Sequence, residues 1–418
     1  MKNDMGGGML YFFTRTQHFF MCASHQMIRG WLPKILISIS LSVCAYDAVA
    51  LDVNIAYLKL EQDAKTATPI YLRTPPNSGL AGAELSMKDS NGAGKFLGHK
   101  YSLLSAMETN QDALISRAES FYQSGTKFYL VDSDAATLKR LQSALPQTTL
   151  IVNVNSPDQG LRTQQCLSNV VHTAPSYRML SDAIAQWLRY KKLTKVLLIT
   201  GSTEQDLAMA DSARASIQRL GLQIVADKPW TFDADLRRST AKEIPQFTQY
   251  TRYDAVWVVD MHNVFGQYIP YNTWLPRPVV GTHGLRADNW HPAIEQWAAI
   301  QLQHRFIEQS NRFMNPLDYS AWVAVRALNA AITQTNSVEP DLILKHLLNS
   351  TFEFGAYKGR KLSFRYWNGQ LRQPIPLAHP NALVASAPLE GYLHPTNDMD
   401  TLGADKQDST CDLTDSKG

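Results

Sequence analysis

The sequence has few of the residue combinations that mark metal sites, nucleotide-binding loops or catalytic groups. Its 418 residues include four cysteines and 11 histidines, and these do not stand at the spacings of a zinc site. It has no G-x-G-x-x-G, so a dinucleotide-binding loop of that kind has no support. The acidic residues at 132–134 lack the glycine and later ligands of a calcium loop. We therefore expect no metal, no cofactor and no catalytic residues, and a protein that is not an enzyme.

Neither sign of charge is in large excess. The chain has 40 Lys and Arg against 37 Asp and Glu, a formal net charge of +3. Four of the basic residues and two of the acidic ones lie within residues 1–50, so the rest of the chain is close to neutral. A protein that binds nucleic acid usually carries a basic stripe. The charge balance argues against a nucleic-acid partner.

Long hydrophobic runs are also missing after residue 50. The one candidate, residues 35–45, is shorter than the roughly 20 residues that a membrane span needs. Arg29 and Lys34 flank its start, and Ala48-Val49-Ala50 offers a cleavage site of the A-x-A kind. These features predict that residues 1–50 are an extension plus signal peptide, cleaved near Ala50. The mature protein would then be exported to the periplasm without a membrane span.

Three questions about this N-terminal region stay open. Residues 1–26 are an unusual prefix for a signal peptide, so translation could begin at Met21 or Met27 instead of Met1. The run could also be an uncleaved anchor. The LSVC sequence at residues 41–44 resembles a lipoprotein box, although Val before the Cys fits poorly.

Cleavage near Ala50 would leave Cys166 and Cys411 as the cysteines of the mature protein. In an oxidising compartment two cysteines permit one disulfide. That bond would tie the polar C-terminal tail to the body of the protein. Two free thiols are an equal alternative on sequence grounds.

What the sequence does contain is a regular alternation of strand and helix patterns. Residues 169–201 show it most clearly, because Leu180, Ile184 and Leu188 recur on one helical face before the buried strand at 195–200. Further strands are expected at 53–60, 99–107, 127–132, 148–154, 222–226, 253–260 and 277–281. Further helices are expected at 80–89, 112–122, 135–145, 203–220, 292–309, 319–335 and 340–348. Such alternation predicts an α/β fold with doubly wound parallel sheets.

The C-terminal part departs from that alternation. Asn368-Gly369 between residues 361–367 and 370–376 predicts a hairpin. From Thr396 the chain is polar, and we expect a loosely ordered tail.

Four stretches resemble one family. They are LAGAELSMKDSNGAGKFLG (80–98), HTAPS (172–176), YKGRKLSFRYWNGQ (357–370) and TLGAD (401–405). Their order along the chain is similar to that in the periplasmic solute-binding proteins of branched-chain amino-acid ABC transporters. Within that group the chain most resembles the substrate-binding subfamily associated with pyrroloquinoline-quinone (PQQ)-dependent alcohol oxidation, a similarity carried by HTAPS (172–176) and TLGAD (401–405).

The resemblance implies a type I periplasmic binding protein, with two Rossmann-like lobes around a ligand cleft. Three crossovers would join the lobes near residues 170–175, 281–285 and 350–360. The first lobe would comprise residues 51–171 and 284–350. The second would comprise 172–283 and 351–397, followed by a polar tail at 398–418. Such lobes close on a ligand by hinge motion.

Candidate ligand-binding residues follow from the position of the strands. In open α/β sheets ligands lie beyond the carboxyl ends of the strands, and two facing lobes would place those ends along one cleft. On the first lobe this rule selects Tyr57, Asp132, Ser133, Asp134, Asn153, Asn155 and Ser156. On the second it selects Ser176, Tyr177, Thr200, Asp260, Thr282 and His283. For each hydroxyl group, a plain helix cap is the more frequent role.

One feature departs from the family. Amino-acid binders carry Ser/Thr-rich, Gly-containing loops where this chain has VDSDA (131–135) and VNVNS (152–156). The carboxylates Asp132 and Asp134 would repel a ligand carboxylate unless they were protonated or paired. An α-amino acid is therefore disfavoured relative to a neutral, polyol-like or cationic solute. Tyr57, Tyr177, Trp230 and Trp290 could stack on such a ligand.

We therefore expect a monomeric solute-binding component that captures a small molecule and delivers it to an inner-membrane ABC permease. A ligand-responsive sensor that docks on a membrane kinase or an oxidation enzyme is the alternative. A periplasmic enzyme on this scaffold is a third, weaker possibility.

Overall fold

The computed structural model describes residues 51–61, 73–231 and 236–413. The predicted signal peptide, its cleavage near Ala50 and the alternative start sites lie outside these described residues. Everything described below belongs to a single compact unit, Ala48–Gly418.

A parallel sheet of five strands, in the order β2-β1-β3-β4-β5, forms the centre of the first lobe. Its strands are β1 (Asp52–Leu60), β2 (Lys100–Glu108), β3 (Phe128–Asp132), β4 (Leu150–Asn153) and β5 (Val170–His172). All residues of β3, β4 and β5 are buried. Burial on both faces explains why these strands read as continuous apolar runs.

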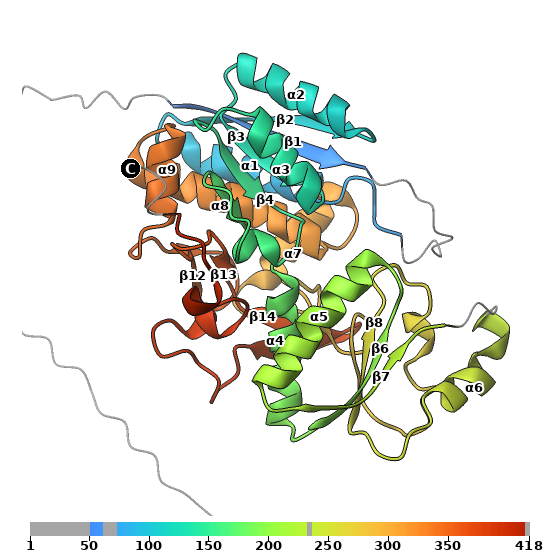
Figure 1. Ribbon diagram of the computed structural model, residues 1–418. Coiled ribbons are helices and arrows are strands. Elements are labelled where there is room, and N and C mark those ends of the chain that lie inside the picture. Colours follow the sequence, from blue (N-terminus) through green and yellow to red (C-terminus); the bar gives the residue numbers. More distant parts are fainter. Residues whose placement is uncertain (1–50, 62–72, 232–235, 414–418) are drawn as a thin grey trace, which may run out of the picture. The chain divides into compact units, whose positions relative to one another are not determined.

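Helices cover both faces of this sheet (Figure 1). They are α1 (Leu80–Gly94), α2 (Gln111–Gln123), α3 (Ala135–Ala144), α7 (Ala299–Ser310), α8 (Pro316–Thr335) and α9 (Pro340–Leu347). Side chains of α1, α7, α8 and α9 share one hydrophobic cluster with the sheet. Those of α2 and α3 share a second cluster on the opposite face. The sheet is thus the middle of three layers.

The second lobe is built around a parallel sheet of four strands in the order β7-β6-β8-β9. Its strands are β6 (Lys195–Thr200), β7 (Gln223–Pro229), β8 (Ala255–Val259) and β9 (Val279–Gly281), and its helices are α4 (Tyr177–Tyr190), α5 (Glu204–Arg219) and α6 (Leu236–Phe247).

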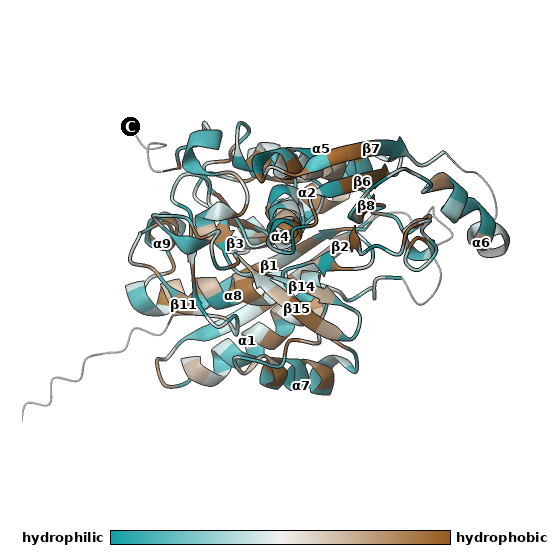
Figure 2. Cartoon of the chain, turned by 90° about the horizontal axis from the view of Figure 1, so that it is seen from below, coloured by the Kyte–Doolittle hydropathy of each residue, from teal (hydrophilic) through white to brown (hydrophobic). Residues whose placement is uncertain are grey.

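Helices of both lobes have one apolar face. Figure 2 shows the periodic change of colour from teal to brown along helices such as α7, which matches this arrangement. The sequence patterns predicted α4 and α5 but missed α6, which contains Pro245.

Short antiparallel strands complete both lobes. They are β10 (Arg286–Ala287), β11 (Phe354–Gly355), β12 (Lys361–Phe364), β13 (Leu371–Arg372), β14 (Ile375–His379) and β15 (Ala382–Ala387). The predicted hairpin is present as β12 and β13, with Ser363 opposite Arg372. Strand β14 begins inside the predicted 370–376 strand, whereas β15 lies beyond the region in which the sequence indicated strands.

The hydrophobic clusters show where the chain passes from one lobe to the other. Val171 belongs to the core of the first lobe and Tyr177 to that of the second. Ala287 lies in the second core and Trp290 returns to the first. Leu371 is in the first core and Ile375 in the second, so these passages fall at residues 172–176, 288–289 and 372–374.

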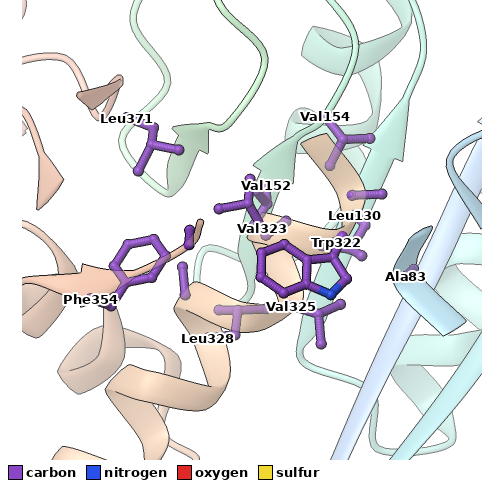
Figure 3. Close-up of a cluster of buried hydrophobic side chains, with 14 of the residues drawn as sticks. Ala83, Leu130, Val152, Val154, Trp322, Val323, Val325, Leu328, Phe354 and Leu371 are labelled. Atoms are coloured by element: carbon purple, nitrogen blue, oxygen red, sulfur yellow. The ribbon is translucent and has the colours of Figure 1, made fainter. Parts of the chain in front are cut away.

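The last of these passages lies later than the 350–360 expected from the resemblance. Phe354 and Leu371 belong to the same buried hydrophobic cluster as Leu328 of α8, and Figure 3 shows these side chains in the core of the first lobe. Residues 354–371 therefore pack with the first lobe, whereas the expected boundary assigned 351–397 to the second.

Other expectations need correction in detail. Helix α1 continues through Asn91 and Gly92 to Gly94, where the sequence suggested a stop. Asn91 stays helical while its side chain exchanges two 2.9 Å hydrogen bonds with the backbone of Tyr101. The helix expected from residue 292 begins only at Ala299. The described part of the tail is not loosely ordered, because Met399, Leu402 and Cys411 are buried.

No helix in the described ranges is both long enough and apolar enough to cross a lipid bilayer.

Candidate functional site

Three predicted site residues meet at the carboxyl edge of the first sheet. Asp132 ends β3, and its Oδ2 accepts a 2.8 Å hydrogen bond from the hydroxyl of Tyr57 in β1. Its Oδ1 accepts a 2.8 Å hydrogen bond from the amide nitrogen of Asn155, which follows β4. Asp132 is 3% exposed, whereas Asn155 is exposed. Asn155 thus connects a buried carboxylate to the surface.

The environment of Asp132 opposes its ionisation. Burial raises the pKa of Asp132 above its usual value, and the hydrogen bond from Tyr57 and the charge of Lys59 only partly offset this. The pKa of the Tyr57 hydroxyl is raised as well, by burial and by the nearby carboxylate. When Asp132 is ionised, a donor or a cation close to it would be stabilised and an anion would be repelled.

The neighbouring polar residues on this edge hold the turns together. Asp134 caps α3, accepting a 2.7 Å hydrogen bond from the backbone N–H of Thr137, and Ser133 donates to the carbonyl of Asp134. Oδ1 of Asn153 accepts the backbone N–H groups of Asn155 and Ser156. The N-terminus of α3 is thus already capped by a carboxylate of the chain, which leaves it poorly suited to a second anion.

On the second sheet, Asp260 organises a loop. It follows β8, is 2% exposed, and accepts backbone N–H groups from Val264, Phe265 and Gly266 at 2.7–3.0 Å. Asp260 therefore fixes the backbone conformation of the loop 261–268, which includes the short helix η3 (Gly266–Tyr268).

Thr282 and His283 lie against the same loop. The Nδ1 atom of His283 is 3.0 Å from the hydroxyl of Thr282, and Nε2 is 3.1 Å from Oδ1 of Asn263. Burial lowers the pKa of His283 to about 4. A neutral ring with its proton on Nε2 can then donate to Asn263 and accept from Thr282. His283 serves here as a hydrogen-bonding group and carries no charge near neutral pH.

The remaining predicted residues have structural partners or deep positions. Ser176 caps α4 by accepting the backbone N–H of Met179 at 3.2 Å. Tyr177 is 7% exposed, and burial raises the pKa of its hydroxyl to about 12. Thr200, at the end of β6, is 3% exposed. These three residues therefore have structural positions inside the second lobe.

The aromatic rings that could have stacked on a ligand are core residues. Tyr57, Tyr177, Trp230 and Trp290 are all between 0% and 8% exposed. Trp290 stacks on Tyr319 with ring centroids 4.8 Å apart, and Trp230 stacks on Phe265 at 4.4 Å.

Sequence reasoning missed the polar side chains that hold the first passage between the lobes. Arg162 is 1% exposed and donates to Gln370 and to the carbonyl of Ala174. Gln370 in turn donates to the carbonyls of His172 and Ala174. No local pattern could have indicated this group, because Arg162 and Gln370 are 208 positions apart.

A second buried group braces the other passages. Lys358 is 4% exposed and donates to the carbonyls of Asn289 and Pro374. Its ammonium lies 4.7 Å from the ring centroid of Tyr319. Burial lowers the pKa of Lys358 to about 7, against the opposing effect of Asp288. The passages at 288–289 and 372–374 are therefore both hydrogen-bonded to one buried, titratable side chain.

The cysteine alternatives are resolved in favour of the disulfide. Cys166 and Cys411 are bonded, with their Cα atoms 5.8 Å apart across a sequence separation of 245. The described residues contain no group of three or more His, Cys, Asp or Glu side chains arranged to hold a metal ion.

One family model matches the chain. Residues 75–246 fit the family described as "Periplasmic binding protein". No curated protein matches the chain in sequence.

Solved structures share the fold at low sequence identity. A periplasmic binding protein from Burkholderia mallei is 12% identical, with a TM-score of 0.62 over 88% of this chain and 99% of that one. A branched-chain amino-acid ABC transporter periplasmic ligand-binding protein from Burkholderia xenovorans LB400 is 14% identical, with a TM-score of 0.65 over 80% and 95%. The isoleucine complex of a branched-chain amino-acid transporter substrate-binding protein from Streptococcus pneumoniae is 14% identical, with a TM-score of 0.59 over 81% and 98%. Together these matches confirm the predicted type I periplasmic binding fold.

Proposed function

From this fold we propose that the protein is a periplasmic solute-binding component of an ABC transporter, which captures a small molecule and delivers it to a membrane permease. The observation that carries the proposal is the pair of parallel sheets, each with a polar carboxyl edge, joined by passages at residues 172–176, 288–289 and 372–374. Ligands of open α/β sheets lie beyond such edges. Closure of two lobes around a solute needs no catalytic group.

The chemistry of the first edge favours a solute without a carboxylate. Asp132 presents a buried carboxylate behind the exposed Asn155. The helix N-termini that could bind an anion are capped internally, α3 by Asp134 and α4 by Ser176. The solute is therefore a cation or a neutral molecule rich in hydroxyl groups, bound through donors that face these acceptors.

The remaining parts of the proposal rest on the sequence resemblance. It supports a cargo linked to alcohol oxidation by PQQ-dependent enzymes and a monomer that carries no cofactor, while export rests on the charged, apolar and A-x-A features of residues 29–50. The residues we assign to the cleft are those at the two carboxyl edges, with Asn155 and Asp132 on the first sheet and the loop organised by Asp260 on the second.

A thermal-shift screen of residues 51–418 tests the proposal. Binding to the folded state stabilises it by about 2.7 kcal/mol at 100 times Kd. The compounds come in matched sets: leucine is compared with leucinol and isoamylamine, which keep the amine and replace the carboxylate by a hydroxymethyl group or by hydrogen, while small alcohols, polyols and polyamines extend the series. We expect stabilisation by an amine or a polyol, and none by leucine.

The variant Asp132→Asn tests whether the charge of Asp132 contributes to binding. It keeps the shape of the side chain and removes the charge, so binding of a cationic solute should weaken at least tenfold in isothermal titration calorimetry. Binding of a neutral polyol should change much less. If no compound shifts the melting temperature, solute capture is not supported, and a ligand-responsive docking protein becomes the better explanation.

A further inference from the structure

The C-terminal segment makes a fourth passage between the lobes. Leu402 is 0% exposed and lies in the core of the second lobe. Leu413 is 7% exposed and lies in the core of the first. We propose that residues 397–413, hereafter the strap, tie the two lobes together and limit how far they can move apart. This deepens the proposed function, because it rests on the hinge motion that solute capture requires.

One end of the strap is anchored on the helices of the second lobe. The backbone N–H of Gly403 donates to Oδ2 of Asp182 in α4 at 2.8 Å. Arg219 of α5 donates to the carbonyl of Thr401 at 2.7 Å and forms a 2.6 Å ion pair with Asp182. Because Asp182 is 0% exposed, these contacts hold the strap to the interior of the lobe.

The middle of the strap is held by two arginines. Arg365, 1% exposed, directly follows β12 and donates to the carbonyls of Met399, Leu402 and Ala404 at 2.6–3.1 Å. Arg365 and Arg372 also share the buried carboxylate of Asp400, each through a 2.8 Å hydrogen bond. Removing either partner of a buried ion pair is strongly destabilising. The strap is therefore fixed where it crosses between the lobes.

The far end is anchored on the first lobe. Ser409 donates to the carbonyl of Arg162 at 2.9 Å, and the backbone N–H of Thr410 donates to the carbonyl of Thr163 at 2.8 Å. The disulfide between Cys166 and Cys411 then makes this end covalent. Arg162 also donates a hydrogen bond to Ala174 in the passage at 172–176. The far end of the strap therefore contacts a residue that holds this passage between the lobes.

Little chain is available to relax between these anchors. Ala404 is buried and Ser409 is hydrogen-bonded, which leaves residues 405–408 between them, three of which form the short helix η5 (Lys406–Asp408). A 3₁₀ turn rises about 2.0 Å per residue and an extended chain about 3.3 Å. Unwinding η5 would thus release only about 4 Å. A larger separation of the lobes would require the disulfide end to detach or the strap to lengthen. It would also break the hydrogen bonds from Arg365, which packs with the first lobe, to residues 399–404.

Distance measurements between the lobes test the strap. Spin labels are attached through a genetically encoded unnatural amino acid at Glu119 of α2 and Ala208 of α5, both exposed, so the native cysteines are untouched. Distances are recorded by pulsed electron paramagnetic resonance on the exported protein without added solute. The parent chain is compared with the double variant Cys166→Ser/Cys411→Ser. It is also compared with a chain that has Gly-Gly-Ser-Gly inserted after Gln407 and keeps the disulfide.

We expect both altered chains to show an inter-lobe distance distribution that is broader or longer than the parent's by at least about 4 Å. The same four residues inserted after Pro380, in the exposed turn between β14 and β15 of the second lobe, should leave the parent's distribution unchanged. The insertion after Gln407 keeps the test decisive even if the double variant folds poorly.

Distributions identical to the parent's in a folded chain with the lengthened strap would overturn the proposal, whatever the change in melting temperature. The outcome is independent of the solute screen, because no solute is present. A failed screen with widened distances would count against solute capture alone, and a successful screen with unchanged distances would count against the strap alone.

Discussion

Helix α1 meets helix α8 so closely at Gly82 that a Cβ added there would lie 1.9 Å from the carbonyl oxygen of Asp318. Asp318 is itself fixed, because its side chain forms a capping box with Asn315 and an ion pair with Arg312. Neither backbone can yield without moving a helix against the sheet of the first lobe.

Gly82→Ala should therefore lower the free energy of unfolding by about 2–4 kcal/mol. Gly92→Ala in the same helix is the matched control, since a Cβ there meets nothing within 4 Å. It should be neutral or stabilising by up to about 1 kcal/mol. Urea unfolding of both variants provides the measurement, and equal effects would mean that the two helices are not in the close contact described.

The buried hydroxyl of Tyr57 gives a second prediction. Tyr57→Phe removes one donor from Asp132, which should destabilise the protein by about 1–2 kcal/mol and raise the pKa of Asp132 further. Because that pKa is already above its unfolded value, the folded state holds the proton over a window above pH 4, and stability falls as pH rises through it. The variant should extend this fall to higher pH.

Tyr129→Phe is the control for this pH effect. Its hydroxyl is also buried but donates to the carbonyls of Ala118 and Thr126. A similar loss of stability without a change in pH dependence is expected in urea unfolding measured from pH 4 to 7. If the two variants gave parallel pH profiles, Tyr57 would not be coupled to the ionisation of Asp132.

Asp260 supports a third prediction. Asp260→Asn leaves one amide NH₂ facing a backbone N–H, because the carboxylate accepts three such groups through both of its oxygens. The expected loss is about 2–4 kcal/mol, with increased hydrogen exchange at residues 261–268. Asp134→Asn should cost little, since Asn caps a helix about as well as Asp. Unchanged exchange in that loop would show that Asp260 does not organise it.

Lys358 makes the stability of the protein depend on pH. Its pKa is lowered to about 7 from the model-compound value of 10.5, so between these values the unfolded chain holds a proton that the folded chain lacks. Stability should therefore rise with pH across this window, by up to about 1.4 kcal/mol per pH unit. Below pH 7 the full penalty of burying the charge is present.

Lys358→Met should flatten this rise and stabilise the protein at pH 6. Asp288 is the charged group that acts on Lys358. Guanidinium unfolding between pH 6 and 10 is the measurement. A rise of the same slope in the variant would assign it to other groups.

The sequence by itself determined the local elements and the class of fold. Continuous apolar runs predicted β3, β6 and β8, and the spacing of Leu180, Ile184 and Leu188 predicted α4, because burial of one helical face or of a whole strand leaves a period in the chain. Strand–helix alternation then allowed little besides parallel sheets. The carboxyl ends of β3 and β4 also selected Asp132 and Asn155 as candidate ligand-binding residues.

Only the tertiary structure decided which polar groups meet. Tyr57 was selected as a possible ligand contact, yet it lies in the core and hydrogen-bonds to Asp132, and Asp260 holds its own loop. Arg162 pairs with Gln370 and Cys166 with Cys411 across more than 200 positions. Such contacts are made when distant segments pack together, so they leave no period in the sequence. The polar tail looked loosely ordered for the same reason, because the few apolar side chains that anchor it are buried against residues distant in the sequence.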